Sequence, residues 1–337
     1  MITTEFSWEA IEEICNAHVA LNLNATRLLT HFRDHCKVRF MFKKEEFFAR
    51  REHSKLFQLY MQQNETIYHF IQKVTFGDEN EEIEFPGKVI FDNSSKTRVL
   101  NDISLHSDYS KWEELFCDLT YEESNLLIKR LTIRDDLTQF ADLPTKLPPF
   151  NEFIFIDPFV NTFNDKALKD NLLRMAKFYS DPLTEFNLII ISSEISQKNI
   201  DDYNEKNPKK LIGNPDEWFE VFFKRLETMV DELNIKCSLT LMDLMNIPRE
   251  SGEESKLFHD RILITNYYQV DFGNSFNFFF GDQISHSAKR TKVTFNSHID
   301  KDAVNAAMNA LNEIDNLIKD YRFRIKGAQT SRYIEFQ

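Results

Sequence analysis

The fold of this chain is decided by the stretch Phe153-Ile154-Phe155-Ile156-Asp157-Pro158. Four apolar, β-prone residues end at a carboxylate and a proline, which is typical of a strand that is buried on both faces and stops there. A second apolar run, residues 188–191, follows after a segment with helical spacing over residues 166–179. Continuous apolar strands that alternate with helices predict a sheet covered on both faces.

The same alternation continues toward the carboxyl terminus. Helical spacing recurs over residues 215–233 and 300–321. Further strands are predicted over residues 235–241, from His259 onward, over 270–280 and over 292–295. We therefore expect an α/β fold for residues 150–322, in which a mixed sheet is flanked by helices.

The first part of the chain has a different pattern. Apolar residues recur at spacings of three and four over residues 4–72 and again over 112–131, which predicts helices. Short strands are expected near residues 89–91 and 98–105, and residues 36–42 suit either a strand or the start of a helix. This part is expected to be a mainly helical α+β domain.

A proline-rich segment separates the two parts. Pro144, Pro148 and Pro149 fall within six residues, and they cannot continue a helix or a central strand. The predicted organisation is an amino-terminal domain over residues 1–143, a second domain over 150–322 and a basic tail over 323–337.

The composition limits the classes of protein. The net charge is −13 over 337 residues, so the surface as a whole repels nucleic acid and anionic membranes, and any phosphate-binding surface must be local. No glycine-rich loop is present among the 7 glycines, so Walker or Rossmann nucleotide binding lacks its backbone cradle. The 4 cysteines have no paired spacing, which argues against disulfides and a cysteine-ligated zinc site.

The chain also carries no targeting signal that can be recognised. Its amino terminus lacks a secretory pattern, and no run reaches the ~18 apolar residues of a membrane helix. We expect a cytoplasmic protein without membrane association, bound metal or cofactor.

One local pattern carries chemistry. It is His259-Asp260-Arg261, followed by an apolar run, Asn266 and then Gly273-Asn274-Ser275-Phe276-Asn277. Residues i and i+2 of a strand point to the same face, so His259 and Arg261 are expected side by side. A histidine beside a cation can attack or protonate a phosphoryl group while the cation holds its oxygens.

This pattern resembles the signature of the phospholipase D superfamily, which is His-x-Lys, four residues, Asp, six residues and Gly-Ser-x-Asn. His259 matches the nucleophile, while Arg261 stands in place of the lysine and Asn266 in place of the aspartate. Asn274-Ser275-Phe276-Asn277 is similar to Gly-Ser-Phe-Asn, with one extra residue in the spacer. The resemblance covers about residues 150–322, and the small endonucleases of the superfamily look most alike.

The resemblance implies a phosphodiesterase, most readily a metal-independent nuclease, with His259 and Arg261 as catalytic residues. The residues then expected to bind phosphate are Asn266, Ser275, Asn277 and His286. Active sites of the family use two such motifs, whereas the full pattern, from His259 through the apolar run to Asn277, occurs once in this chain. An active form is therefore expected to be a homodimer that brings two His259 side chains together.

A basic stretch in the first part of the chain is a candidate nucleic-acid surface. Its cations alternate with phenylalanines that could stack on bases, and they include Arg39, Lys43, Lys44, Arg50 and Arg51. The other interpretation is an amphipathic helix whose cations pair with nearby glutamates. His31 and His35 have a spacing that suits zinc, but solvated histidines on a helix face are the favoured interpretation.

A second hypothesis is that the protein has the same fold but no catalytic activity. The departures at Arg261 and Asn266 suit a non-catalytic subunit that binds a phosphorylated ligand, nucleic acid or a protein partner, for example in a bacterial defence or mobile-element system. A phospholipid substrate is less favoured, because no apolar or basic element that would face a membrane is evident.

Overall fold

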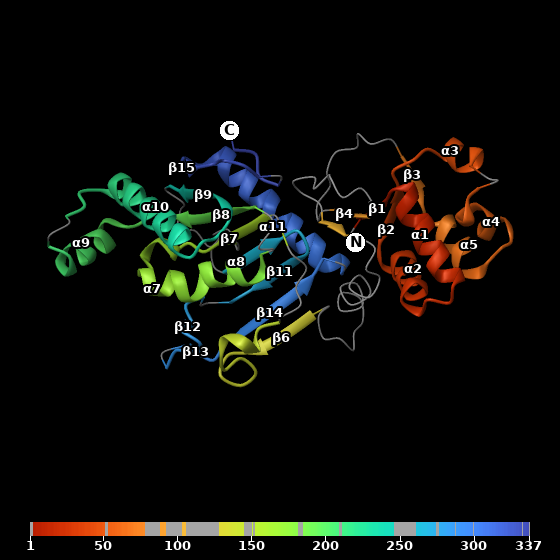
Figure 1. Cartoon of the computed structure of the whole chain (residues 1–337). Coiled ribbons are helices and arrows are strands. Elements are labelled where there is room, and N and C mark those ends of the chain that lie inside the picture. Colours follow the sequence, from red (N-terminus) through yellow and green to blue (C-terminus); the bar gives the residue numbers. More distant parts are fainter. Residues whose placement is uncertain are drawn as a thin grey trace. The chain divides into compact units, whose positions relative to one another are not determined.

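The chain folds into two compact units, which are drawn in the computed structural model of Figure 1. The first comprises Met1–Ile128 with Asn296–Val304, and the second comprises Lys129–Phe295 with Asn305–Gln337. The structure describes residues 3–50, 53–77, 88–91, 103–105, 128–144, 150, 152–180, 185–208, 211–245, 261–273, 276–286, 288–298, 300–331 and 333–336.

The first unit contains a five-stranded sheet in which all neighbouring strands are parallel, in the order β3-β2-β1-β4-β5. The strands are β1 (Thr3–Phe6), β2 (Lys37–Phe40), β3 (Thr75–Phe76), β4 (Lys88–Phe91) and β5 (Ile103–Leu105). Parallel strands need crossover connections, which here are helical between β1 and β3. The mainly helical α+β domain predicted from the sequence is thus organised around a parallel sheet.

The helices of this unit follow polar caps. They are α1 (Trp8–Val19), α2 (Leu23–His35), α3 (Lys44–Ala49), α4 (Lys55–Met61) and α5 (Glu65–Gln72). The side chains that accept a hydrogen bond from the first turn of a helix are those of Ser7, Asn22, Ser54 and Asn64. Each cap fixes the residue at which a helix begins. The stretch predicted as largely helical therefore forms several short helices rather than one or two long ones.

The second unit contains an eight-stranded mixed sheet in the order β15-β9-β8-β7-β10-β11-β14-β6. The strands are β6 (Ile128–Thr132), β7 (Glu152–Ile156), β8 (Phe186–Ser193), β9 (Cys237–Leu244), β10 (Ile262–Thr265), β11 (Tyr268–Asp271), β14 (Lys292–Ser297) and β15 (Phe323–Gly327). A separate ribbon is formed by β12 (Phe279–Phe280) and β13 (Gln283–Ile284).

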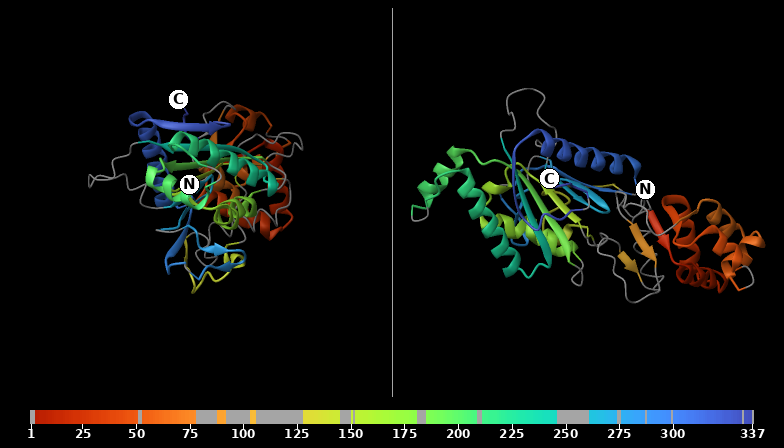
Figure 2. Two further views of the ribbon diagram at one scale, coloured as in Figure 1. Left: turned by 90° about the vertical axis from the view of Figure 1, so that its left-hand side faces the viewer. Right: turned by 90° about the horizontal axis from the view of Figure 1, so that it is seen from above.

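The centre of this sheet is parallel and its flanks are antiparallel. β7, β8 and β9 run parallel, whereas β15 is antiparallel to β9, and β10 is antiparallel to β7. All five residues of β7 are buried, as expected for a strand covered on both faces. Figure 2 shows α11 on one face of the sheet and α8 and α10 on the other. The predicted mixed sheet flanked by helices is confirmed at this level.

The helices predicted over residues 166–179, 215–233 and 300–321 are close to the observed ranges, whereas α9 (Gln197–Lys206) was not predicted. α7 (Asp165–Ala167), the π-helical η4 (Leu168–Leu173) and α8 (Arg174–Tyr179) follow one another without a break. The others are α10 (Pro215–Glu232) and α11 (Lys301–Asp320), with the 3₁₀ turns η2 (Phe140–Asp142) and η3 (Val160–Thr162). No helix in the described ranges has the length and apolar character needed to cross a membrane.

Two predicted boundaries need correction. Residues 128–132, expected to end a helix of the first domain, form β6 at the edge of the second sheet, and the Ile133 N–H donates to the Thr291 carbonyl at 2.9 Å. Residues 323–327, expected to belong to a basic tail, form β15, because Arg324 and Lys326 are neutralised by Glu194, Asp216 and Glu220. Most of the proline-rich segment, residues 145–149, lies outside the described residues.

Candidate active site

The carboxyl ends of the three parallel strands carry polar residues. Asp157 follows β7, Ser192 and Ser193 end β8, and Asp243 lies near the end of β9. Carboxyl ends of neighbouring parallel strands meet at one edge of a sheet, which is where open α/β sheets bind their ligands. β10 begins at this edge, since Ile262 pairs with Ile156.

Arg261 is held at this edge by the hairpin of β10 and β11. Its N–H donates to the Gly273 carbonyl at 3.2 Å, and its carbonyl accepts from the Phe272 N–H at 2.9 Å. The guanidinium Nε lies 3.6 Å from Asp157 Oδ1, and the group lies 5.2 Å from the ring centre of Phe159. The hairpin thus brings Arg261 beside the start of the Gly273-to-Asn277 segment. Arg261 itself precedes β10, whereas it was predicted within the strand.

Asp157 is fully buried next to this cation. Its Oδ1 accepts from the Phe159 N–H at 2.8 Å, and its Oδ2 has no hydrogen-bond partner in the described part of the chain. Burial raises the pKa of Asp157 to about 6, although the Phe159 N–H and the Arg261 guanidinium oppose the rise. The carboxyl group can therefore change its charge near neutral pH while it orients Arg261.

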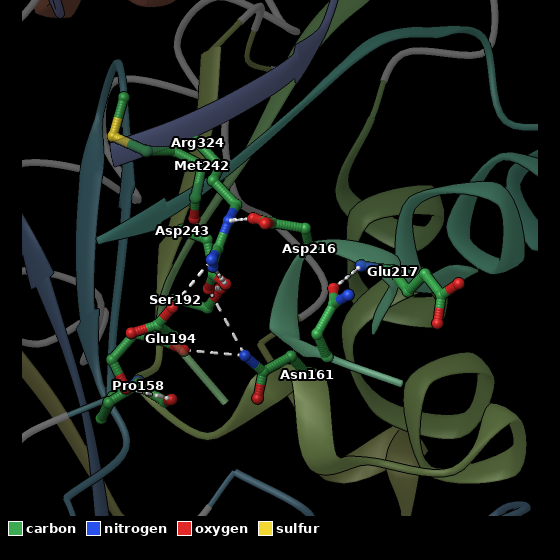
Figure 3. Close-up of polar contacts among 11 residues, drawn as sticks. Pro158, Asn161, Ser192, Glu194, Asp216, Glu217, Met242, Asp243 and Arg324 are labelled. Carbon is green, nitrogen blue, oxygen red and sulfur yellow. Dashed lines mark hydrogen bonds and ion pairs between the residues drawn. The ribbon is translucent and has the colours of Figure 1, made fainter. Parts of the chain in front are cut away.

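A second buried carboxylate lies two strands away, at Asp243 (Figure 3). Its Oδ1 accepts from the Ser192 hydroxyl and, at 3.4 Å, from Asn161 Nδ2, which also donates to the Ser193 carbonyl at 2.8 Å. Burial raises the pKa of Asp243 to about 6, although the Ser192 hydroxyl and Arg324 oppose the rise. These contacts tie the ends of β8 and β9 to η3.

Arg324 of β15 completes this cluster. It lies 2.8 Å from Glu194 and 3.7 Å from Asp243 Oδ2, and it also pairs with Asp216. One cation faces three carboxylates, so the cluster carries no excess of positive charge with which to attract phosphate. We therefore interpret it as a support that joins β9, β15 and α10, rather than as a phosphate-binding site. Among the described residues, no group of three or more His, Cys, Asp or Glu side chains is placed to hold a metal ion.

Asn277 lies in a groove at the same end of the sheet. Residues that follow β7 and β8 line this groove, together with α9, α10 and the β12–β13 ribbon, and its volume is about 1070 Å³. Asn277 is exposed, and its Oδ1 accepts a hydrogen bond from Asn171 Nδ2 at 3.3 Å. The amide hydrogens of Asn277 take no part in this bond. This residue is accessible to a ligand, as its predicted phosphate-binding role requires.

Other predicted residues are placed differently. Asn266 is buried at the far end of β10 from Arg261; its Oδ1 accepts from the Glu152 N–H at 3.0 Å, and its Nδ2 donates to the Tyr333 hydroxyl at 2.9 Å. It joins the start of β7 to the carboxy-terminal segment, so the phosphate-binding role predicted for it does not fit. His286 is exposed, and its carbonyl accepts from Arg134. His259 and Ser275 lie outside the described residues.

Only some of the cations in the basic stretch of the first unit are exposed. Arg39 is buried in the sheet, where it pairs with Glu5 at 3.1 Å, so it is not available to nucleic acid and this part of the prediction was wrong. Lys43 and Lys44 are exposed, and the exposed Arg50 lies 4.8 Å from the ring centre of Trp8. Arg51 lies outside the described residues.

The histidine pair of α2 also departs from expectation. His31 is buried, although a solvated helix face was favoured. The side chain of His35 is not described.

The sequence does not predict the cluster around Asp243 as a unit. A usable signal was present, because Ser192 and Asp243 directly follow apolar runs in two of the predicted strands. Polar residues at the carboxyl ends of parallel strands gather at one edge. Arg324 had no such signal, since its strand was predicted as a tail.

Comparison with known proteins identifies no relative. No protein-family model matches the chain, and neither a curated protein nor a solved structure is significantly similar to it. Function must therefore be inferred from the residues and their geometry.

Proposed function

We propose that the second unit is a phospholipase D-like phosphodiesterase, most readily a nuclease that needs no metal ion. The observation that carries the proposal is the β10–β11 hairpin. It holds Arg261 beside Gly273 at the carboxyl edge of β7, next to the buried Asp157. A His-x-cation motif and a following Ser-x-Asn segment must meet in order to act on one phosphate, and the backbone hydrogen bond between Arg261 and Gly273 supports such a meeting.

Each residue has a role in this proposal. His259 precedes Arg261 by two positions, and two residues of chain span at most about 7 Å, so its imidazole can serve as nucleophile at the same phosphate. Arg261 binds non-bridging oxygens through its planar fork, and Asn277 and Ser275 donate to the remaining oxygen. Asp157 is a positioning residue that orients the guanidinium.

The reaction proceeds by two displacements at phosphorus. An imidazole nitrogen of His259 forms a bond to phosphorus while the bond to the ester oxygen breaks, and the leaving oxygen takes a proton from His259 of the partner subunit. Water then attacks the phosphohistidine, gives its proton to the partner histidine and releases the phosphate monoester. The proposal therefore includes a homodimer of the second unit. It requires neither a cofactor nor a membrane surface.

His259→Ala tests the nucleophile. We expect cleavage of labelled DNA or RNA to fall by at least about a thousandfold, because the covalent route is lost. His53→Ala is the matched control, since His53 is exposed and lies in the first unit. Cleavage is measured by gel electrophoresis with single- and double-stranded substrates, with chelator present. Activity that survives His259→Ala, or that disappears with chelator, would exclude this mechanism.

A non-catalytic role is the second candidate, and one observation favours it. Arg261 already faces a carboxylate, which reduces its capacity to stabilise the charge of a transition state. If the wild type cleaves nothing, Arg261→Ala should weaken binding of a phosphorylated ligand by about 1.5–3 kcal/mol, while Arg290→Ala, a change at an exposed surface cation, should not. Unchanged affinity would leave a scaffold role for a protein partner.

A further inference from the structure

The groove that contains Asn277 is larger than a phosphoryl group requires. Its volume is about 1070 Å³, which is at the upper end of the range for pockets that hold whole small molecules. Most of its lining side chains are polar, so it does not suit an acyl chain. A substrate whose phosphate lies at Asn277 therefore has room for a bulky polar group beside that phosphate.

An exposed aromatic ring forms one side of the groove. Phe280 of β12 is 61% exposed, and Lys166 Nζ lies 3.5 Å from the centre of its ring. Exposing this much apolar surface costs free energy unless a ligand covers it. The ammonium group lies over one face of the ring, so a base can stack only on the other face, while the positive charge remains close to the phosphate of the same nucleotide.

A buried donor lies in the wall of the same groove. Trp218 of α10 is 4% exposed, and its indole Nε1 has no hydrogen-bond partner in the described part of the chain. The ring is held by the edge-on Tyr203 at 4.7 Å. An unsatisfied buried N–H is unfavourable, and a carbonyl oxygen or ring nitrogen of a ligand that displaces the side chains covering this nitrogen would satisfy it.

We propose that this groove binds an unstacked base of a single-stranded nucleic acid. The inference rests on the proposed function and specifies its substrate class. The base stacks on Phe280, its acceptor atoms approach the Trp218 N–H, and the adjoining phosphate lies toward Asn277 and Lys166. A base inside a duplex cannot enter such a groove without being unpaired, so single strands are preferred.

The test measures binding separately from cleavage. A labelled decanucleotide is titrated by fluorescence anisotropy into the full chain carrying His259→Ala, so that the strand is not cut. In this background we expect Phe280→Ala to weaken binding by about fivefold to a hundredfold, the scale of one base–aromatic stack. Phe178→Ala is the matched control, because Phe178 is 41% exposed on α8 and lies outside this groove. Trp218→Phe should weaken binding by about twofold to tenfold, since it removes only the N–H.

A second strand of the same length, built from abasic sugars, shows how much the bases contribute to the affinity. The background protein should bind it more weakly than the normal strand, and Phe280→Ala should remove that preference. Equal binding by the Phe280 and Phe178 variants, equal binding of the two strands, or no binding of any strand would overturn the inference. Cleavage by the wild type tests the proposed function independently, so the two proposals fail by different results.

Discussion

Asp157 and Asp243 are two buried carboxyl groups at the ends of parallel strands, and their surroundings separate their roles. Asp157 faces Arg261 and the exposed ring of Phe159, beside the segment that returns to Asn277. Asp243 is enclosed by Ser192, Asn161 and Arg324, all of which bind the fold together. A substitution at Asp243 should therefore report on stability more than on chemistry.

The pH dependence of stability provides the test. The pKa of Asp243 in the folded chain, about 6, lies above its ordinary value of 3.8, so between these values the native state binds more protons than the unfolded state. The contribution of this group to the free energy of unfolding is most favourable below about pH 4, falls as the pH rises to about 6 and then stays constant.

Asp243→Asn removes this titration. Relative to the wild type, the free energy of unfolding of the variant should rise by about 1–3 kcal/mol between pH 4.5 and pH 7.5. Urea titrations at both pH values measure the difference, and Asp320→Asn, at an exposed carboxylate of α11, is the control. A difference from wild type that is the same at both pH values would show that Asp243 does not titrate as inferred.

Among the elements, the π-helical η4 has the clearest link to the candidate site. Asn171 lies on η4 and is fully buried; its Oδ1 accepts from the Phe278 N–H at 3.1 Å and from the Phe279 N–H at 2.8 Å. Its Nδ2 donates to the Asn277 side chain and to the Phe279 carbonyl. One side chain thus fixes the segment that presents Asn277 and Phe280, and π-helical turns are often found at functional sites.

Asn171→Ala should loosen that segment. The Phe279 N–H would lose the Asn171 acceptor, and the Phe278 N–H would keep only the Phe276 carbonyl at 3.0 Å. The free energy of unfolding should therefore fall by about 1–3 kcal/mol, and the amides of residues 278 and 279 should exchange faster with deuterium. Asn305→Ala, at an exposed asparagine of α11, should change neither quantity appreciably. Unaltered exchange at residues 278 and 279 would contradict the positioning role of Asn171.

The elements that could be predicted from the sequence have signals within their own residues. β7 and β8 are apolar runs, and α10 and α11 have long amphipathic repeats with clear boundaries. β6 and β15 are edge strands with two cations each, so their hydrophobic signal is weak, and only pairing with distant strands stabilises them. The sequence also predicts fewer strands for the first unit than its five-stranded sheet contains, because short strands such as β3 and β5 have a weak signal.

The candidate site also has a part with a local sequence signal and a part that depends on distant contacts. Arg261 and the Gly273-to-Asn277 segment could be expected together because one hairpin joins them. The contacts around Asp243 join residues 51 positions apart, and the contact of Arg324 with Glu194 spans 130 positions. No local pattern contains such pairs, which form only when the whole sheet assembles.

At the scale of the whole molecule, the single occurrence of the full pattern from His259 to Asn277 leads to a prediction about assembly. The net charge of −13 makes association between copies unfavourable unless a specific surface holds them, so a dimer must be a property of the fold. If one His259 attacks phosphorus and the other protonates the leaving oxygen, each dimer contains active sites only when both subunits keep the histidine.

Mixing wild type with His259→Ala tests this requirement without a structure of the dimer. After subunit exchange at a fixed total concentration, an equal mixture contains about one quarter wild-type homodimers, so cleavage should fall to about a quarter of the pure wild-type rate, following the square of the wild-type fraction. Analytical ultracentrifugation is used to check whether both proteins sediment as dimers, and a mixture with His53→Ala controls for dilution. A rate that falls only in proportion to the wild-type fraction, to about one half, would mean that each His259 acts within a single subunit, and the proposed two-histidine mechanism would then have to be abandoned.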